Sequence, residues 1–270
     1  MDASKIIVLT TGSEEKSARR LGYPTYTYLP YGQNLKDKVI IRWGNGFLNA
    51  PIENIIFSET DDFDNVINRQ KSIELNVDKP KALQTISKAV LTPKIYLTAV
   101  PNKKIVVFRP KTHSSGQGFQ LLKGPFNIVS ESYATEYIKT EKEIRVFVCG
   151  NKTLTCSREK AKKADSDICR SNYAYVRFRK TPIRLHRMAL RATKALNLEV
   201  GAFDVLVKNR KYYFLEFNTA VSVEKQATEF YKKNIPVLIK KRFPAIYNQK
   251  VELKPKPSFF NSLIQKMKSL

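Results

Sequence analysis

Cysteine and histidine are scarce in this chain of 270 residues, which has three of the first and two of the second. The cysteines, Cys149, Cys156 and Cys169, are odd in number and lack the paired spacing of metal ligands. His113 and His186 are far apart in the sequence, and neither is placed as a base beside a nucleophile. A disulfide scaffold, a zinc site and a Cys–His catalytic pair are therefore poor interpretations, and a reducing compartment fits.

Long hydrophobic runs are also missing. No stretch approaches the roughly 20 apolar residues needed to cross a bilayer. Near the N-terminus the only apolar run covers residues 6–9, whereas a secretory signal needs about 7 to 15 such residues. We therefore expect a cytoplasmic protein that neither spans a membrane nor is exported. Hydrophobic residues make up 42% of the chain, which is enough for an ordinary globular core.

Acidic residues are few beside the basic ones, at 24 against 48, and the formal net charge is +24. The excess is concentrated in two blocks. Residues 151–194 hold 13 lysines and arginines against 3 acids, and residues 225–270 hold 11 against 2. A surplus of this kind predicts an anionic partner, which includes nucleotides, nucleic acid, acidic peptides and anionic lipid.

Hydrophobic periodicity predicts strands and helices in an interleaved order. Strands over 6–10 and 38–43 would open a small α/β lobe, and Asp78 would cap a helix over 79–89 with Pro80 in its first turn. The sequence therefore predicts an α+β body preceded by a small, shortened α/β lobe. Its remaining elements are strands over 104–108, 118–122, 134–138, 144–148, 153–156, 202–208 and 212–217, and a helix over 182–196.

Three oxygen-bearing side chains lie on the last two predicted strands. Because side chains alternate along a strand, Glu216 and Asn218 share a face, and a turn at Asn209 and Arg210 would bring Asp204 beside them. Oxygen ligands of this kind suit Mg²⁺, which takes its remaining ligands from nucleotide phosphates and water. Two isolated surface acids at strand ends are the alternative, and spacing alone does not separate the two interpretations.

A loop of small residues joins the predicted strands 104–108 and 118–122. Its backbone N–H groups could cradle phosphate oxygens, with positive charge added by the two flanking cations. An ordinary hairpin loop is the alternative, because the spacing matches no phosphate-binding fingerprint. The residues concerned are Arg109, Lys111, Ser114, Ser115, Gly116 and Gly118.

Further cations stand at the edges of predicted elements. Arg145 alternates with Ile144 and Val146 on a strand, so it is expected to face away from them and toward a cleft. Each of these cations, taken alone, is compatible with a solvated side chain. The others are Lys79, Arg158 and Arg170.

In chain order these motifs form a series. It runs Asp78-Lys79, Ser114-Ser115-Gly116-Gln117-Gly118, Glu136-Tyr137-Ile138, Glu143-Ile144-Arg145, Arg158, Arg170-Ser171-Asn172, Asp204 and Glu216-Phe217-Asn218. The series resembles the ATP-grasp superfamily, most closely the ligases that add glutamate to the C-terminus of a ribosomal protein and short ATP-grasp proteins of phage genomes. The resemblance covers about residues 71–224. It implies a fold in which two α+β lobes close on ATP, with Mg²⁺ as a second cofactor.

The resemblance also implies a role for each position. Lys79 and Arg109 would contact phosphates, beneath the loop 114–118. Main-chain groups of Tyr137 and Ile138, in the segment that begins at Glu136, would read the edge of the adenine. The magnesium ligands would be Asp204, Glu216 and Asn218. The transferred phosphoryl group and the carboxylate substrate would face Arg145, Arg158, Arg170 and Asn172.

The implied activity is ATP-dependent carboxylate–amine ligation through an acyl phosphate. The basic block 151–194 extends beyond what ATP can neutralise, so we expect an anionic, macromolecular acceptor such as an acidic peptide or nucleic acid. Three features depart from the family pattern: Arg109 replaces the usual lysine, residues 219–222 lack the usual proline and glycine, and the N-terminal lobe is shortened. A kinase that phosphorylates a polyanion and a nucleic-acid-binding protein on a nucleotide-binding scaffold are the alternatives. A pure binder would not need the three metal-type ligands.

We expect four segments in the chain. Residues 1–75 would form the N-terminal lobe, 76–138 the central lobe with the phosphate loop, and 139–245 the C-terminal lobe with the metal site. Residues 246–270 would form a basic tail that ends in an amphipathic helix capped by Ser258. We expect this helix to dock on the protein itself, and dimerisation and membrane-surface binding are the alternatives.

Overall fold

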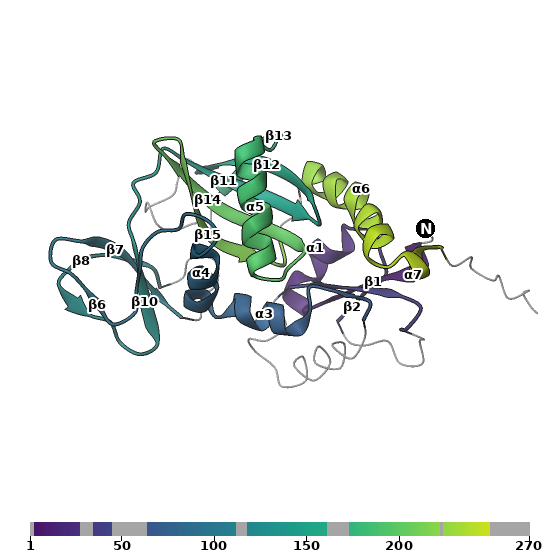
Figure 1. Ribbon diagram of the computed structural model, residues 1–270, viewed down its shortest axis with the longest axis horizontal. Coiled ribbons are helices and arrows are strands. Elements are labelled where there is room, and N and C mark those ends of the chain that lie inside the picture. Colours follow the sequence, from purple (N-terminus) through teal and green to yellow (C-terminus); the bar gives the residue numbers. More distant parts are fainter. Residues whose placement is uncertain are drawn as a thin grey trace, which may run out of the picture.

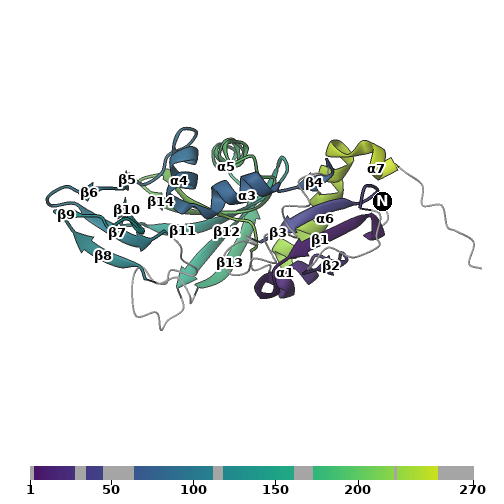
Figure 2. The same cartoon turned by 90° about the horizontal axis from the view of Figure 1, so that it is seen from below.

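The computed structural model describes residues 3–27, 35–44, 64–111, 118–160, 173–221 and 224–248. Three main sheets lie in a row along the long axis of the molecule (Figure 1). The sheet of the first four strands lies at one end, a five-stranded sheet lies in the middle, and a four-stranded sheet lies at the other end (Figure 2). Within the described ranges, no helix has the length and apolar character needed to cross a membrane.

The N-terminal sheet is parallel and has the strand order β2-β1-β3-β4. Its central strands, β1 (Ile6–Thr10) and β3 (Val39–Trp43), are buried at every residue, which is typical of a parallel sheet covered on both faces. The other elements of this region are β2 (Thr25–Tyr26), β4 (Val66–Ile67), η1 (Ala3–Lys5), η2 (Gly12–Glu14) and α1 (Glu15–Arg19).

The four-stranded sheet at the far end is antiparallel, in the order β5-β10-β7-β8. One of its faces encloses a small core of Tyr96, Val100, Val106 and Ala134. Its strands, with the separate pair β6–β9, are β5 (Ile95–Tyr96), β6 (Ala99–Val100), β7 (Ile105–Pro110), β8 (Gln120–Lys123), β9 (Phe126–Asn127) and β10 (Ser132–Glu136).

The middle sheet is also antiparallel, in the order β13-β12-β11-β14-β15. The turn between its last two strands uses Asn209 and Arg210, both with positive φ, as a tight hairpin requires. The strands are β11 (Lys142–Cys149), β12 (Lys152–Lys160), β13 (Tyr173–Lys180), β14 (Val200–Lys208) and β15 (Lys211–Asn218).

Helices cover both faces of the middle sheet. On one face α4 and α5 pack over an apolar layer that includes Ile144, Val146 and Phe203. On the other face α6 packs against β11 and β12 and separates them from the N-terminal sheet. The helices are α3 (Gln70–Val77), α4 (Lys79–Ser87), α5 (Ile183–Ala195), α6 (Lys225–Arg242) and α7 (Pro244–Asn248).

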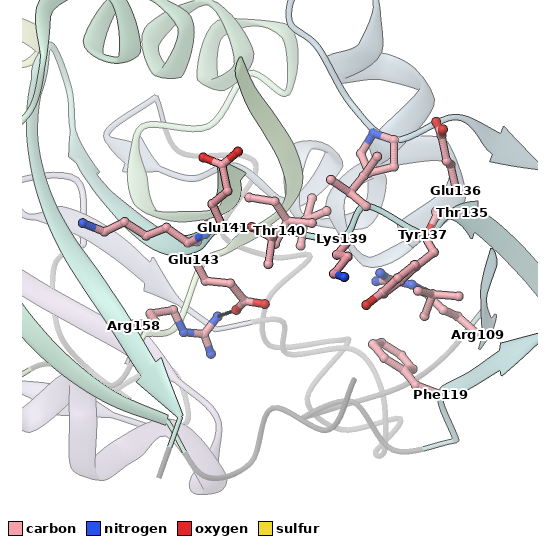
Figure 3. A pocket seen from close by; sticks show the side chains of 16 residues that line it. Arg109, Phe119, Thr135, Glu136, Tyr137, Lys139, Thr140, Glu141, Glu143 and Arg158 are labelled. Atoms are coloured by element: carbon pink, nitrogen blue, oxygen red, sulfur yellow. Dashed lines mark hydrogen bonds and ion pairs between the residues drawn. The ribbon is translucent and has the colours of Figure 1, made fainter. Parts of the chain in front are cut away.

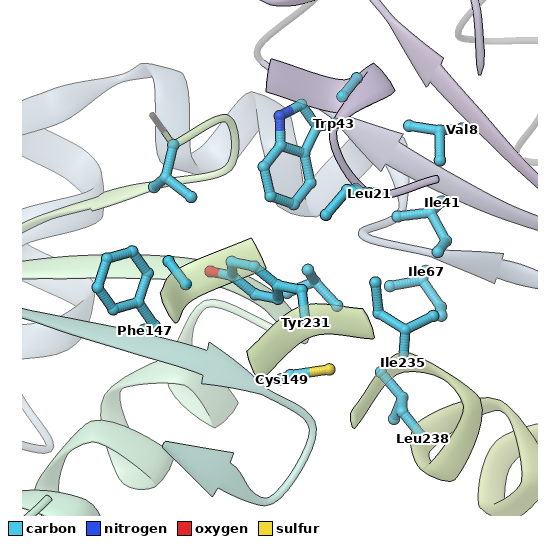
Figure 4. Packing of buried hydrophobic residues seen from close by; sticks show 14 of the residues in the cluster. Val8, Leu21, Ile41, Trp43, Ile67, Phe147, Cys149, Tyr231, Ile235 and Leu238 are labelled. Carbon is cyan, nitrogen blue, oxygen red and sulfur yellow. The ribbon is translucent and has the colours of Figure 1, made fainter. Parts of the chain in front are cut away.

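Tyr231 of α6 joins the N-terminal and middle sheets in one core (Figure 4). Its ring meets the edge of Trp43 at 5.4 Å and lies 6.2 Å from the ring of Phe147. Its hydroxyl donates a hydrogen bond of 2.7 Å to the carbonyl of Gly201, so this buried polar group has a partner. The N-terminal sheet and the middle sheet are therefore held by shared packing and not by a linker alone.

Asn68 is a second tie between these two sheets. Its amide group donates to the carbonyl of Val200 at 2.8 Å and accepts from the backbone N–H groups of Glu199 and Val200 at 2.9 and 3.1 Å. The residue has φ of 60°, a left-handed conformation that asparagine tolerates better than most residues. One side chain thus fixes the start of β14 against the end of β4.

Most predicted elements are present. The strand 6–10 and the capped helix after Asp78 are confirmed, and Asp78 accepts a hydrogen bond from the N–H of Lys81 at 3.1 Å. α3, α6 and β13 were not predicted; in α6 the paired lysines and Pro236 interrupt the apolar period. The predicted tail helix lies outside the described residues. The segment boundaries at 75, 138 and 245 remain predictions.

Candidate functional site

The face of the middle sheet opposite α4 and α5 has three zones. Phe147, Cys149 and Ala202 belong to the core shared with the N-terminal sheet. At the other end of the same strands, Leu206 and Leu215 form a small apolar patch with Ile138. Between these two zones runs a set of charged side chains that we call the charged row, which consists of Glu143, Arg145, Arg158, Asp204 and Glu216.

Strand register explains the charged row. Arg145 lies opposite Asp204, Asp204 lies opposite Glu216, and Glu143 lies opposite Arg158. Residues that face each other across an antiparallel pair project from the same side of the sheet. Arg145 therefore faces away from Ile144 and Val146, as the sequence predicts.

Asp204 is the centre of the charged row and is almost fully buried. Arg145 holds its carboxylate in a two-point contact, with Nε and Nη2 at 2.7 and 3.0 Å from the two oxygens. Arg158 adds a third contact at 3.1 Å and lies 3.9 Å from Glu143. Two buried guanidinium groups thus surround one buried carboxylate, and this compensation makes the burial of all three charges tolerable.

The two other predicted metal ligands adjoin Asp204. Glu216 lies opposite it on β15, and the side-chain amide of Asn218 is 3.4 Å from its carboxylate. The backbone between Glu216 and Asn218 is fixed, because buried Asn76 of α3 donates a 3.0 Å hydrogen bond to the carbonyl of Phe217. Strand alternation thus brings the three side chains close together, with the amide nitrogen of Asn218 facing Asp204, and their role as metal ligands remains a prediction.

Lys79 reaches the charged row from outside the middle sheet. It is the first residue of α4, and its ammonium group lies 4.0 Å from the carboxylate of Glu216. The Asp78 cap fixes the start of the helix and with it the position from which Lys79 extends. The site thus has a cation on each side of Glu216 and Asp204.

A cavity of about 310 Å³ lies beside the charged row, between the middle sheet and the four-stranded sheet (Figure 3). Leu206 and Leu215 line it on one side, and the chain segment from Glu136 to Glu143 passes along it. Arg158 and Glu143 point toward each other on one wall, and Arg109, Tyr137 and Phe119 gather on the opposite wall. The cavity therefore joins an apolar floor to charged walls.

Arg109 projects into this cavity from β7 and is buried. Its guanidinium carbon lies 4.5 Å from the centroid of the Phe119 ring, a cation–π contact. Lys111, two residues later, is 43% exposed at its side chain and lies 4.0 Å from Glu131, and it does not line the cavity. Of the two predicted cations, only Arg109 is at the cavity.

The segment Glu136–Ile138, which is predicted to lie along the adenine, lines the cavity. The backbone N–H of Tyr137, however, donates to the carbonyl of Ile105 at 3.0 Å. The N–H of Tyr137 is therefore already used within the protein. Of the main-chain groups predicted to bind the adenine, the carbonyl of Tyr137 and the backbone groups of Ile138 remain candidates.

Gly118 ends the predicted phosphate loop. It has φ of 72°, and a Cβ atom would lie 2.9 Å from the Cγ of Pro110, so both the conformation and the space require glycine. The other loop residues, Ser114, Ser115 and Gly116, lie outside the described residues, as do Arg170 and Asn172.

Several cavity residues were not assigned a role from the sequence, namely Phe119, Glu143, Leu206 and Leu215. Leu215 reaches the cavity because the register shifts by one residue between Asp204 and Val205. The extra residue sends Leu215 to the same side as Glu216. In the sequence, this irregularity is indicated only by the unbroken apolar run 212–215, which does not alternate as a regular half-buried strand would.

The two cysteines that the structure describes, Cys149 and Cys156, are buried. Cys156 lies opposite Arg145, and burial raises the pKa of its thiol to about 12. Burial also raises the pKa of the Cys149 thiol. Both thiols stay protonated at neutral pH, and Cys169 lies outside the described residues.

The basic block 151–194 does not form one surface. Arg158 faces the cavity, but α5, which carries Arg184, Arg187, Arg191 and Lys194, packs on the opposite face of the middle sheet. The sequence-based expectation was that the cations of α5 extend the positive surface around Arg158 and the other predicted catalytic arginines. The structure does not support this expectation, because α5 lies on the other face of the sheet.

Comparison with known proteins identifies the fold. A family model described as a RimK-like ATP-grasp domain matches residues 63–242. The chain belongs to the RimK-like ATP-grasp family. The superfamily and the α+β fold expected from the sequence are confirmed, and the family supports the expected class of ATP-dependent ligase. No curated protein matches the chain.

Solved structures share this RimK-like ATP-grasp architecture at low sequence identity. A D-alanine–D-alanine ligase from Bacillus anthracis has a TM-score of 0.62 and 15% identity, over 89% of this chain and 97% of its own. The ATP-grasp ligase PsnB, in complex with minimal precursor, Mg and ADP, has a TM-score of 0.60 and 14% identity, over 90% and 98%. A ligase associated with RiPPs from Chryseobacterium gregarium, in complex with ADP and a leader and core peptide, has a TM-score of 0.58 and 14% identity, over 88% and 97%.

Proposed function

We propose that the protein is an ATP- and magnesium-dependent carboxylate–amine ligase that acts through an acyl phosphate. The observation that carries this proposal is the position of the charged row directly beside a cavity with an apolar floor. A nucleotide needs an apolar surface for its base and cations for its phosphates, and the two lie next to each other here.

In this proposal the adenine lies on Ile138, Leu206 and Leu215. The carbonyl of Tyr137 and the backbone of Ile138 are its hydrogen-bonding partners. The phosphates extend toward Arg109 and Lys79, which approach the cavity and the charged row from two different elements. The loop with Ser114, Ser115, Gly116 and Gly118 would cover them, and Lys111 at its start would add charge without direct contact.

The magnesium ligands in the proposal are Asp204, Glu216 and Asn218. Their carboxylate and amide oxygens fit the preference of Mg²⁺ for hard oxygen donors. When bound, the ion would neutralise charge on the phosphoryl oxygens. Asp204 shares its oxygens with Arg145 and Arg158, so metal binding has to redistribute these contacts.

The chemistry consists of two transfers. A substrate carboxylate oxygen attacks the γ-phosphorus of ATP and ADP leaves; an amine then attacks the acyl carbon and inorganic phosphate leaves. Arg145 and Arg158, with Arg170 and Asn172, would neutralise and orient the phosphoryl group and the carboxylate. Charge stabilisation by preorganised cations is the main contribution that a protein makes to such transfers. No side-chain nucleophile is required.

A peptide is the proposed source of the carboxylate. Two of the similar structures hold precursor or leader and core peptides, and this supports a peptide as the substrate class.

The test is a substrate screen with acidic peptides and amino acids as carboxylate and amine donors. ADP and inorganic phosphate are measured in parallel, and products are separated by mass. A ligase releases ADP and phosphate in equal amounts and joins the two substrates with loss of water. ADP without free phosphate, with a product heavier by one phosphoryl group, would instead identify a kinase. Absence of ATP binding in the presence of Mg²⁺ would refute both.

A further inference from the structure

The outer surface of α5 is unusually basic. Arg184, Arg187, Arg191 and Lys194 are all exposed, and their spacing of three, four and three residues places them along one side of the helix. Across its 13 residues α5 contains no aspartate or glutamate. None of the four cations forms an ion pair with any residue that the structure describes. We call these four residues the α5 stripe.

The neighbouring helix α4 is also basic on its exposed side. α4, which packs beside α5 on the same face of the middle sheet, also lacks acidic residues and exposes Lys81. The helical layer on this face therefore presents positive charge without any acid from its own two helices. This differs from the charged row on the other face of the sheet, where every arginine contacts a carboxylate.

The α5 stripe works against the stability of its own helix. Like charges three or four residues apart repel each other, and the stripe contains three such neighbouring pairs. Arg184 also lies in the first turn, where the helix dipole disfavours a cation. A surface selected only for solubility would gain from interleaved acids, which would remove both penalties. An arrangement that costs local stability points to a binding role.

The shape of this surface narrows the partner. α5 lies in the helical layer on this face of the sheet and is seen end-on in Figure 2, so its outer side is a convex strip along that face. An extended peptide usually binds in a groove or along a sheet edge, whereas the exposed side of a helix fits the grooved surface of a nucleic acid duplex. The stripe has no exposed aromatic residue that could stack on an unpaired base. Guanidinium groups, which form three of the four cations, match phosphate oxygens in two-point contacts.

We propose that the α5 stripe is a docking surface for the phosphodiester backbone of a double-stranded nucleic acid. We expect this binding to be independent of base sequence, because contacts of the four cations to phosphate oxygens are the same for every sequence. The middle sheet separates this surface from the proposed ATP site, so docking and nucleotide binding use opposite faces. The proposal does not depend on the reaction that the protein catalyses.

The experiment compares two variants of equal charge in the full-length protein. One is Arg184→Gln/Arg187→Gln/Arg191→Gln on α5, and the matched control is Lys232→Gln/Lys233→Gln/Lys241→Gln on exposed positions of α6. Binding to labelled 20-base-pair DNA and RNA duplexes of random sequence is titrated between about 50 and 200 mM salt. The two duplexes distinguish DNA from RNA as the source of the phosphodiester backbone. An oligo-glutamate peptide and anionic lipid vesicles are titrated in parallel.

The α5 variant should lose at least tenfold in duplex affinity at 100 mM salt. Its slope of log affinity against log salt should fall by about 2.7, since each phosphate contact on a duplex contributes about 0.9. The α6 control should keep most of the affinity and slope, and ATP binding should be the same in all three proteins. Equal losses in both variants, an absence of duplex binding by the unmodified protein, or tighter binding of oligo-glutamate or vesicles than of duplexes would overturn the proposal.

Discussion

The contact between Arg109 and Phe119 gives a sharp test of the proposed phosphate site. Phe119→Leu removes the aromatic face but keeps most of the apolar volume beside Arg109. A cation–π contact contributes about 0.5 kcal/mol when exposed and about 2 kcal/mol when desolvated, and Arg109 is buried. If the ring holds the guanidinium in position for phosphate, the substitution should weaken Mg–ATP binding by about 1 to 2 kcal/mol, or roughly 5- to 30-fold.

Calorimetric titration of four proteins isolates the pair: the unmodified chain, Phe119→Leu, Arg109→Met and the double variant. The coupling free energy between Phe119→Leu and Arg109→Met should be close to the full effect of Phe119→Leu on ATP binding. The reason is that the ring has no guanidinium to position once Arg109 is replaced. Arg109→Lys should keep part of the affinity, and Lys111→Met, at an exposed position away from the cavity, should keep nearly all of it. The reasoning would be refuted if the losses in ATP-binding free energy caused by Phe119→Leu and Arg109→Met add, within about 0.5 kcal/mol, to the loss in the double variant. If the unmodified chain does not bind ATP, the proposed function fails instead.

Three other predictions follow from single sites. Glu216→Gln should abolish Mg²⁺-dependent ADP formation while leaving the thermal unfolding temperature within a few degrees, because Glu216 is partly exposed; unchanged turnover would exclude it as a ligand. Gly118→Ala should destabilise the protein by about 1 to 3 kcal/mol in denaturant titration, since its φ of 72° and the 2.9 Å approach to Pro110 both oppose a side chain. In a Cys169→Ser background the native protein should resist thiol reagents at pH 8, and its stability should fall as pH rises from about 9 toward 12, because the unfolded thiol of Cys156 ionises first. Rapid labelling of the native protein would contradict this burial.

The metal-type cluster was predictable because it depends on one local rule. Alternation along β15 places Glu216 and Asn218 on one side, and the short turn at Asn209 and Arg210 brings Asp204 opposite Glu216. No long-range information is needed for this step. The same rule gave the orientation of Arg145, since the apolar residues on either side of it must face the core.

The register shift at Leu215 was not predictable in the same way. Phe214 and Phe217 both pack against Phe203, with ring centroids 5.1 and 4.6 Å away, although their separation of three residues places them on opposite sides of a regular strand. The extra residue resolves this conflict and sends Leu215 to the cavity floor. The choice between a regular strand and a bulge depends on packing against another strand, which local spacing does not contain.

The basic block shows the most consequential limit of reasoning along the chain. Its cations are adjacent in sequence, yet β12 directs Arg158 into the cavity while α5 carries its stripe to the opposite face. The two groups also differ in energy: Arg158 is buried and compensated by Asp204 and Glu143, whereas the stripe costs its helix about 0.2 to 0.5 kcal/mol for each like-charge pair. Net charge alone suggests one large anionic substrate. Burial and pairing instead separate a compensated set of charges suited to a small phosphorylated ligand from an uncompensated set that remains available to a polyanion, and only the fold distinguishes them.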